Sequence, residues 1–335
     1  MMYSFFKRVL KFLFIPIIIL IFVIAGYFIY DPFRVLYSYG SYSHTHANRD
    51  YYSIEIFNKR YPQQKYNSFI FGSSRTLGYN PGSWKEYLGE NASVFMLDGY
   101  CENIYGIYHK MKYLDSLNVD IKNVLIILDV EGTLTDVKPS KGFLFMKHPL
   151  ISGESMFDFQ LEQFKAYMDN LNSALRYYLY YLGGMKNEFI YSHLGNLRAS
   201  VDSISNELRI VVFDNQITEN PEKFYSKPIF YERSEHLQTS DCQIKEEQYR
   251  MLSTVAGILT KHQTNYKIII GPDYAQKKYC EEDTNVLVNL FGKENVYDFS
   301  GKNKITESKY NYYEKSHYRP HVGDSIMKYI YNKHN

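Results

Sequence analysis

Short, continuous runs of apolar residues recur through most of this chain, and they limit the folds that it can adopt. Runs such as Ser68–Phe71 and Asn123–Asp129 are a few residues long and consist largely of Phe, Val, Ile and Leu. Because the apolar residues are continuous rather than alternating, we expect strands that are covered on both faces, as in parallel sheets. The predicted strands are Ser68–Phe71, Ser93–Leu97, Asn123–Asp129, Tyr266–Ile270 and Asn295–Phe299.

Helical patterns separate these runs, as expected for the crossover connections of a parallel sheet. The alternation predicts an α/β fold with a mainly parallel, five-stranded sheet. We expect one domain over residues 66–335, a length that easily buries a core. The predicted helices are Glu102–Leu117, Ile244–His262, Thr284–Phe291 and Val322–Tyr331.

A helical insertion at about residues 132–263 interrupts this alternation. Its apolar residues recur at spacings of three, four or seven, which predicts an amphipathic helix, and Gly183-Gly184 is a natural stop. Two interpretations remain open: a cap that shapes an acceptor groove, or an enlarged set of covering helices. The apolar residues of the predicted helix are Phe157, Leu161, Phe164, Met168, Leu171, Leu175 and Leu182.

The segment from Phe12 to Tyr30 carries no charge and is mostly apolar. It is long enough to cross the hydrocarbon core of a bilayer as a helix. Basic side chains at positions 7, 8 and 11 precede it, so the positive-inside rule places residues 1–11 in the cytoplasm as a tail. We expect residues 12–30 to be a transmembrane anchor, with the remainder of the chain outside the membrane.

A cleavable signal peptide is the alternative to this anchor. Val23-Ile24-Ala25 has the small-residue character of a cleavage site, but the apolar run is longer than a usual signal core. The uncleaved anchor is therefore the favoured interpretation. Residues 31–65 have little periodicity and are polar and rich in Tyr, which predicts a stem that ends near Tyr61-Pro62.

The charge and the cysteine content argue against two classes of protein, nucleic-acid-binding proteins and disulfide-rich scaffolds. The formal net charge is +2 over 335 residues and no basic stripe is present, so we expect no nucleic-acid partner. Three cysteines are too few for a disulfide framework. Outside the membrane Cys242 and Cys280 could form one bridge; free or buried thiols are the alternative.

Gly72-Ser73-Ser74-Arg75 follows the first predicted strand directly and places a hydroxyl at the edge of the sheet. Near the C-terminus, Glu314 and His317 lie three residues apart, which suits an acid that orients a base. Together they suggest a nucleophile, a base and an orienting acid for acyl transfer. Each part also has a simpler explanation, because Ser is a preferred helix cap and a lone His is usually structural.

The chain resembles the SGNH (GDSL-like) hydrolase superfamily, and within it membrane-anchored bacterial members that handle acyl groups on cell-envelope polymers. The matching motifs are Phe71-Gly72-Ser73-Ser74-Arg75, Val94-Phe95-Met96-Leu97-Asp98-Gly99 and Tyr312-Tyr313-Glu314-Lys315-Ser316-His317-Tyr318, in order over about residues 66–332. The resemblance implies a three-layer α/β/α, flavodoxin-like fold. It also implies Ser74 as nucleophile, His317 as base, Glu314 as acid, and the amides of Ser74 and Gly99 as oxyanion donors.

The sequence departs from the family pattern at two points. The acid before the histidine is Glu314, where the family usually has Asp. No asparagine follows the third strand, which continues as Asp129-Val130-Glu131-Gly132, although the family places an oxyanion Asn there. Asn103 is a candidate substitute donor. Losing one oxyanion donor typically costs about 100- to 1000-fold in rate.

Two further charged positions have open interpretations. Arg75 could bind an anionic donor or glycan, or pair with a nearby carboxylate. Asp129 could contact substrate, or form with Glu131 a carboxylate pair for glycoside or metal chemistry, because ligands of α/β folds bind at the ends of strands. Strand-end loops with acidic residues are also commonplace.

The sequence is therefore compatible with three functions. The first is a serine-dependent O-acyltransferase or O-acetylesterase, without metal or cofactor, which acts on an extracytoplasmic cell-envelope polysaccharide at the bacterial inner membrane. The resemblance implies an acyl donor and a polytopic membrane-bound O-acyltransferase as partners. The second is a non-catalytic glycan-binding or assembly subunit with the same fold. The third is a glycan-processing site built on Asp129 and Glu131.

Overall fold

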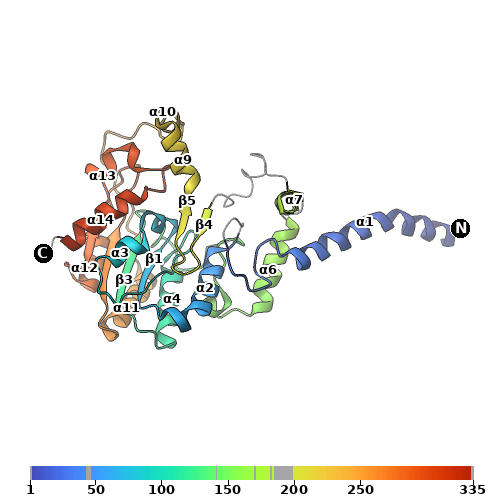
Figure 1. The fold of residues 1–335 in the computed structure, drawn as a ribbon, viewed down its shortest axis with the longest axis horizontal. Coiled ribbons are helices and arrows are strands. Elements are labelled where there is room, and N and C mark those ends of the chain that lie inside the picture. The colour runs from blue at the N-terminus through green and yellow to red at the C-terminus, as the bar shows by residue number, and fades with distance from the viewer. Residues whose placement is uncertain are drawn as a thin grey trace.

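The computed structural model describes residues 2–42, 47–140, 142–169, 171–181, 183–184 and 199–332. Its centre is a sheet of five parallel strands in the order β2-β1-β3-β6-β7 (Figure 1). The predicted α/β class and parallel sheet are confirmed. The strands are β1 (Ser68–Gly72), β2 (Val94–Met96), β3 (Asn123–Leu128), β6 (Asn265–Ile270) and β7 (Val296–Asp298).

The strand order identifies the edge of the sheet where a ligand is expected. Counted among themselves in chain order, the strands run 2-1-3-4-5, so the direction of winding reverses between β1 and β3. These two strands pair in register from Ser68 with Asn123 to Gly72 with Ile127. Open parallel sheets bind ligands outside the carboxyl ends of the strands at such a reversal. The segments after Gly72 and after Leu128 therefore border the expected site.

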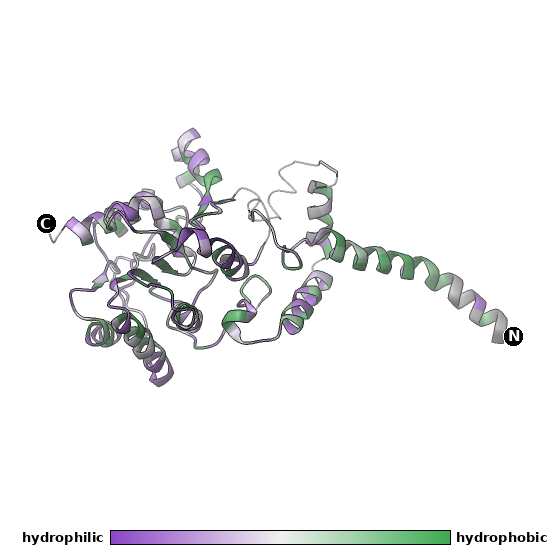
Figure 2. Cartoon of the chain, turned by 60° about the horizontal axis from the view of Figure 1, so that its bottom comes forward, coloured by the Kyte–Doolittle hydropathy of each residue, from purple (hydrophilic) through white to green (hydrophobic). Residues whose placement is uncertain are grey.

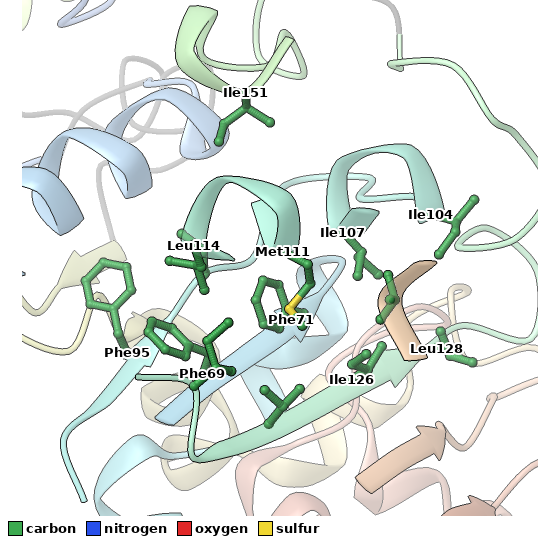
Figure 3. Close-up of a cluster of buried hydrophobic side chains, with 14 of the residues drawn as sticks. Phe69, Phe71, Phe95, Ile104, Ile107, Met111, Leu114, Ile126, Leu128 and Ile151 are labelled. Atoms are coloured by element: carbon green, nitrogen blue, oxygen red, sulfur yellow. The ribbon is translucent and has the colours of Figure 1, made fainter. Parts of the chain in front are cut away.

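Both faces of the sheet are buried, as the continuous apolar strands predicted. Phe69 and Phe71 belong to the larger core cluster, in which they pack with Met111 and Leu114 of α4 (Figure 3). Ile70 points to the other face and a second cluster. The first cluster includes residues of α2 (Arg49–Gln64), α4 (Ile104–Ser116), α11 (Glu246–Lys261) and α12 (Glu281–Phe291), and the second includes residues of α3 (Pro81–Lys85) and α14 (Pro320–Asn332).

The predicted stem is not a separate segment, because α2 is part of the domain. Asn48 caps this helix by accepting a hydrogen bond from the amide of Tyr51. Ile54 and Phe57 lie fully buried in the larger core cluster. The first turn buries two charged residues, Arg49 and Asp50, and these charges hide the apolar periodicity that would have revealed the helix.

The insertion contains several separate elements. The single amphipathic helix predicted from Phe157 to Leu182 is described as two helices, and Leu182 itself lies outside the described residues. An antiparallel hairpin was not predicted, because its strands have only three residues each. The elements are α5 (Pro149–Ser152), α6 (Met156–Asp169), α7 (Leu171–Tyr181), β4 (Ala199–Val201), β5 (Leu208–Ile210), α9 (Val211–Glu219) and α10 (Pro221–Tyr225).

The β4–β5 hairpin covers the edge of the sheet at β2. Ser205 in its turn accepts a hydrogen bond of 2.9 Å from the amide of Met96, and the Asn206 side chain donates one of 2.6 Å to the Met96 carbonyl. Exposed strand edges invite pairing with other chains. This part of the insertion therefore protects the sheet edge.

The N-terminal helix α1 (Met2–Tyr30) projects from the domain, and its apolar part is visible in Figure 2. Its segment Phe12–Tyr30 is apolar and long enough to cross a membrane or to be a signal sequence. The C-terminal end of α1 is packed against the domain: Tyr27 is 1% exposed and belongs to a cluster with Phe159 and Tyr167 of α6.

The structure contains a disulfide between Cys242 and Cys280, while Cys101 is a free, exposed thiol. The bridge closes a loop with a sequence separation of 38 residues and joins the segment before α11 to the start of α12. Loop-closure entropy for this length corresponds to about 4 kcal/mol of stability.

We therefore expect the Cys242→Ala/Cys280→Ala variant to lose about 4 kcal/mol of unfolding free energy, because its unfolded chain regains that entropy. Urea titration of the full chain in detergent, with and without reductant, measures the loss. Cys101→Ala is the matched control and should keep the wild-type midpoint. A wild-type midpoint that reductant leaves unchanged would contradict the prediction.

Candidate active site

Ser73 and Ser74, which follow β1, have different structural roles. Ser73 caps the short helix η1 (Ser74–Gly78), because its hydroxyl accepts a hydrogen bond of 3.2 Å from the amide of Arg75. The capping function expected of serine in this turn thus falls on Ser73. The hydroxyl of Ser74, the first residue of η1, is left to face the C-terminal loop.

Ser74, His317 and Glu314 form one chain of hydrogen bonds. The Oγ atom of Ser74 lies 2.7 Å from Nε2 of His317. On the other side of the imidazole, Nδ1 is hydrogen-bonded to Oε1 of Glu314. The second carboxylate oxygen of Glu314 accepts a hydrogen bond of 3.0 Å from the amide of Ser316. This is the geometry of a nucleophile, a base and an acid that fixes the tautomer of the base.

The histidine loop is attached to the serine turn through Tyr318 and Gly78. Tyr318 is 1% exposed, and a Cβ atom at Gly78 would lie 2.2 Å from its ring. Only glycine therefore allows the ring to pack at this distance. Within the loop, the amide of Tyr313 donates a hydrogen bond of 2.9 Å to the carbonyl of His317. Because Tyr318 adjoins His317 in sequence, this contact fixes the base relative to Ser74.

The surroundings of Glu314 favour its ionised carboxylate form, which is the form that an acid beside His317 requires. Burial raises the pKa of its carboxyl, but the hydrogen bond and charge of His317 and the Ser316 amide outweigh burial. The net pKa of Glu314 therefore lies below its ordinary value. A carboxylate at this position stabilises an imidazolium on His317.

The triad opens into a cleft of about 470 Å³ at the carboxyl edge of the sheet. Its walls come from the turn after β1, the turn before α4, the loop after β3 and the histidine loop, which matches the edge that the strand order identifies. A second cleft of about 460 Å³ lies between residues 139–147 and α6, and Ser140 lines both. Side chains that line the first cleft include Ser74, Cys101, Asn103, Asp129, Thr135 and His317.

Two expected oxyanion donors already have hydrogen-bond acceptors. The amide of Gly99 donates to the carbonyl of Gly72 at 3.2 Å, because the turn after β2 continues the pairing with β1. The side-chain amide of Asn103 donates to the carbonyl of Lys138 at 2.6 Å, and its oxygen caps α4. Among the described residues the amide of Ser74 donates no hydrogen bond, and the Asn103 side chain keeps a second N–H, so these two donors of the expected set are available.

Gly99 has a different structural role. A Cβ atom at this position would lie 2.4 Å from Oδ2 of Asp50, so the missing side chain lets the buried carboxylate approach the turn. The expectation that Gly99 supplies an oxyanion amide is not met in this conformation.

The charged residues near the triad are paired with one another. Arg75 lies between two carboxylates, with Nε 3.2 Å from Asp129 and Nη2 3.1 Å from Asp273. Burial raises the pKa of Asp129, an effect that Arg75 opposes. Glu131 is paired separately with Lys277 at 2.6 Å. Arg75 is therefore paired with nearby carboxylates, which was one of its two expected roles. Asp129 is paired with Arg75, and Glu131 with Lys277.

Metal-ligand geometry is found elsewhere in the described part of the chain. Cys242, Cys280 and Asp283 bring their ligand atoms within 4.8 Å of one another, but both sulfurs belong to the disulfide. Sulfurs in a disulfide are not thiolates, so these residues do not form a metal centre in this state.

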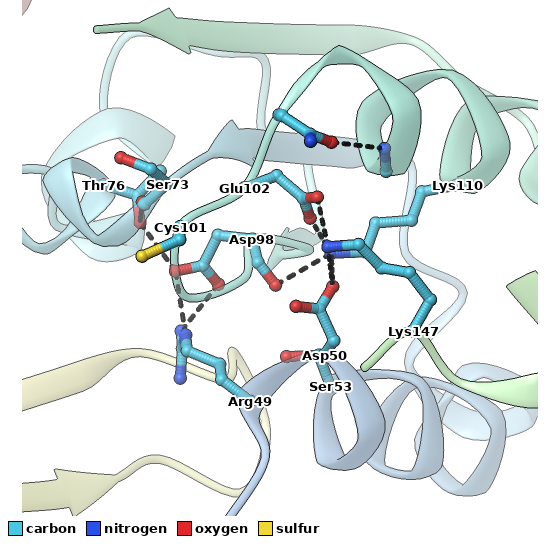
Figure 4. A network of polar contacts seen from close by, with 12 residues as sticks. Arg49, Asp50, Ser53, Ser73, Thr76, Asp98, Cys101, Glu102, Lys110 and Lys147 are labelled. Atoms are coloured by element: carbon cyan, nitrogen blue, oxygen red, sulfur yellow. Dashed lines mark hydrogen bonds and ion pairs between the residues drawn. The ribbon is translucent and has the colours of Figure 1, made fainter. Parts of the chain in front are cut away.

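A buried network of charges, which was not predicted from the sequence, includes Glu102 from the lining of the cleft (Figure 4). Arg49 is paired with Asp98 at 2.7 Å, and Asp98 also accepts a hydrogen bond of 2.6 Å from Thr76 of η1. The network connects α2, the turn after β2 and η1. Its further members are Asp50, Glu102, Lys110 and Lys147, all at most 2% exposed.

Comparison with protein-family models finds no match for the chain. A search of curated proteins finds no similar sequence. The function must therefore be argued from the fold and from the geometry of this site.

Substitution of Arg49 by Met should destabilise the protein by about 3–5 kcal/mol, because it leaves the carboxylate of Asp98 buried without its cation. The urea midpoint of the full chain measures the loss. Lys122→Met is a matched control in the exposed ion pair with Asp120 and should leave the midpoint unchanged. Equal midpoints for the two variants would contradict the prediction.

Proposed function

We propose that the chain is a serine-dependent acyl-transfer enzyme. One observation carries the proposal: Ser74 Oγ, His317 and Glu314 are joined by hydrogen bonds, and they lie at the reversal of the strand order. A helix cap and a structural histidine would not require a carboxylate on the far nitrogen of the imidazole. The cleft beside Ser74 offers room for an acyl group and an acceptor.

The proposed reaction has two half-reactions. In the first, His317 Nε2 removes the proton from Ser74 Oγ, which attacks the carbonyl carbon of an ester, and the leaving alcohol receives that proton. Glu314 keeps Nδ1 protonated and stabilises the imidazolium. The amide of Ser74 faces the developing oxyanion. In the second, an acceptor hydroxyl or water releases the acyl group from Ser74, with His317 again as base.

The fold supports membership of the SGNH superfamily. Its strand order, 2-1-3-4-5, is the flavodoxin-like order, and helices pack on both faces of the sheet, as in a three-layer α/β/α arrangement. The triad residues also follow the chain order of that family. We propose on these grounds that the chain is a member of this superfamily, with a Glu in place of the usual Asp.

We further propose that α1 anchors the enzyme in the bacterial inner membrane, with the domain outside. The domain uses the end of α1: Tyr167 donates a hydrogen bond of 2.9 Å to the carbonyl of Val23. Cleavage after Ala25 would remove this contact. The Cys242–Cys280 disulfide fits an oxidising compartment.

The substrate in this proposal is an O-acylated cell-envelope polysaccharide, or an acyl donor from which such a polysaccharide is modified. Transfer and hydrolysis share the first half-reaction, so the same triad serves both. A polytopic O-acyltransferase that brings acyl groups across the membrane is the partner that this role requires, because the anchor alone offers no such path.

A non-catalytic glycan-binding subunit is the second candidate. It is favoured by the engagement of the Gly99 amide with Gly72, because losing one oxyanion donor weakens the oxyanion hole. The third candidate, a glycan-processing carboxylate pair, loses support because Asp129 and Glu131 are each held in an ion pair.

Labelling with a fluorophosphonate distinguishes the first two candidates. We expect the full chain in detergent to be labelled, and Ser74→Ala and His317→Ala to abolish labelling. Ser73→Ala is the matched control, because it removes the neighbouring hydroxyl and should retain labelling. Glu314→Gln should label about 10³- to 10⁴-fold more slowly, since an amide stabilises the wrong imidazole tautomer.

Two results of this experiment would contradict the proposed enzyme or its nucleophile. Absence of labelling in the folded wild type, with p-nitrophenyl acetate left intact, would favour the binding subunit. Labelling that persists in Ser74→Ala would show that another residue is the nucleophile.

A further inference from the structure

Two helices of the insertion cross the C-terminal end of α1. Both α6 and α7 run across the axis of α1 rather than along it (Figures 1 and 2). On α6, Phe164 and Tyr167 pack against Tyr27 with ring centroids 5.1 and 4.9 Å apart. On α7, the ring of Tyr178 lies 5.4 Å from that of Tyr30. If α1 stands across a membrane, these helices lie in the plane of its surface.

The contacts reach into the apolar part of α1. Tyr167 binds the carbonyl of Val23, and a Cβ atom at Gly26 would lie 3.1 Å from the hydroxyl of Tyr178. Val23 precedes the end of α1 by seven residues, which is about 10 Å along a helix. Amphipathic helices at a membrane surface are immersed by about 5–10 Å. Helices that contact α1 at this level therefore lie at the depth of an interfacial helix.

One face of α7 is apolar and uncovered. Leu171, Leu175 and Leu179 follow each other at intervals of four residues, so they share one face of the helix. Their exposed fractions are 39%, 56% and 37%. Phe28 and Ile29 of α1 are likewise 51% and 66% exposed. Leu179 follows Tyr178 in sequence, and the Tyr178 ring packs on Tyr30, so the partly exposed leucines begin next to the contact with α1.

The composition of α7 also suits a lipid interface. The segment Leu171–Tyr181 contains no Asp or Glu, and Arg176 is its single charged residue. It is rich in Tyr, a residue that is enriched at membrane–water boundaries. Anionic headgroups therefore meet no carboxylate on this helix. A protein partner would not require the leucines to lie at the depth of the apolar segment of α1.

We propose that α7, with the adjoining end of α6, is an interfacial platform whose Leu171, Leu175 and Leu179 side chains insert among phospholipid chains of the outer leaflet. The proposal rests on the anchoring of α1 that is proposed above, and it is independent of the chemistry of Ser74. With this platform inserted, the domain contacts the membrane surface directly and is not connected to it through α1 alone.

Spin labels on the full chain in phospholipid nanodiscs test the platform. In a Cys101→Ser background, nitroxides are attached to Leu175→Cys, Leu179→Cys and, as a matched aqueous control, Leu237→Cys, an exposed leucine remote from α1 in sequence. We expect the oxygen-to-nickel accessibility ratio at positions 175 and 179 to exceed that at 237 several-fold, because oxygen partitions into lipid and the nickel complex into water.

A label at Phe22→Cys separates failure of the platform from failure of the anchor. Phe22 is 73% exposed on the apolar segment of α1. If position 22 is in lipid while 175 and 179 match the aqueous control, the platform is wrong and the anchor stands. If position 22 is also aqueous, both are wrong. Low accessibility of 175 and 179 to both reagents would show a protein partner instead of lipid and would also overturn the proposal.

Discussion

The carboxylate of Asp98 joins the parts of the molecule on which the candidate site depends. Arg49 of α2 pairs with it at one side, and Thr76 of η1 donates to it at the other. The helix before the first strand and the turn that carries Ser74 are therefore fixed to the same group. Because all three side chains are buried, no water can replace a lost partner, and the position of Ser74 depends on a residue that precedes the sheet.

The remaining charges of the network hold the turn between β2 and α4. Lys110 and Lys147 neutralise Asp50 and Glu102, and Gly99 provides the space for the Asp50 carboxylate. Because this turn is held in place, the Gly99 amide stays hydrogen-bonded to the carbonyl of Gly72. The backbone is thus already hydrogen-bonded at the place where a second oxyanion donor was expected.

The sequence was most informative where burial leaves a continuous pattern. Each predicted strand of the sheet is present within one residue at its ends, because strands covered on both faces must be apolar throughout. The helix α2 was missed for the opposite reason: its first turn buries Arg49 and Asp50, and buried charges resemble a polar stem.

The candidate site likewise has features that could be predicted from the sequence and features that could not. The proximity of Ser74, Glu314 and His317 followed from short motifs at the ends of one alternating pattern. The engagement of Gly99 and Asn103 could not be predicted, since it depends on how one turn is placed against β1 and against the loop at Lys138. No single stretch of sequence contains that information.

The packing of Tyr27 against α6 seats the end of α1 directly on the domain. An enzyme on a long tether samples a hemisphere of solution, but a domain seated directly on its anchor can only diffuse laterally. With α1 in a membrane, Ser74 would stay at a constant height, and encounters with substrate would be confined to a thin layer. Ser140 lines both the triad cleft and the cleft beside α6, so the two clefts meet at this residue.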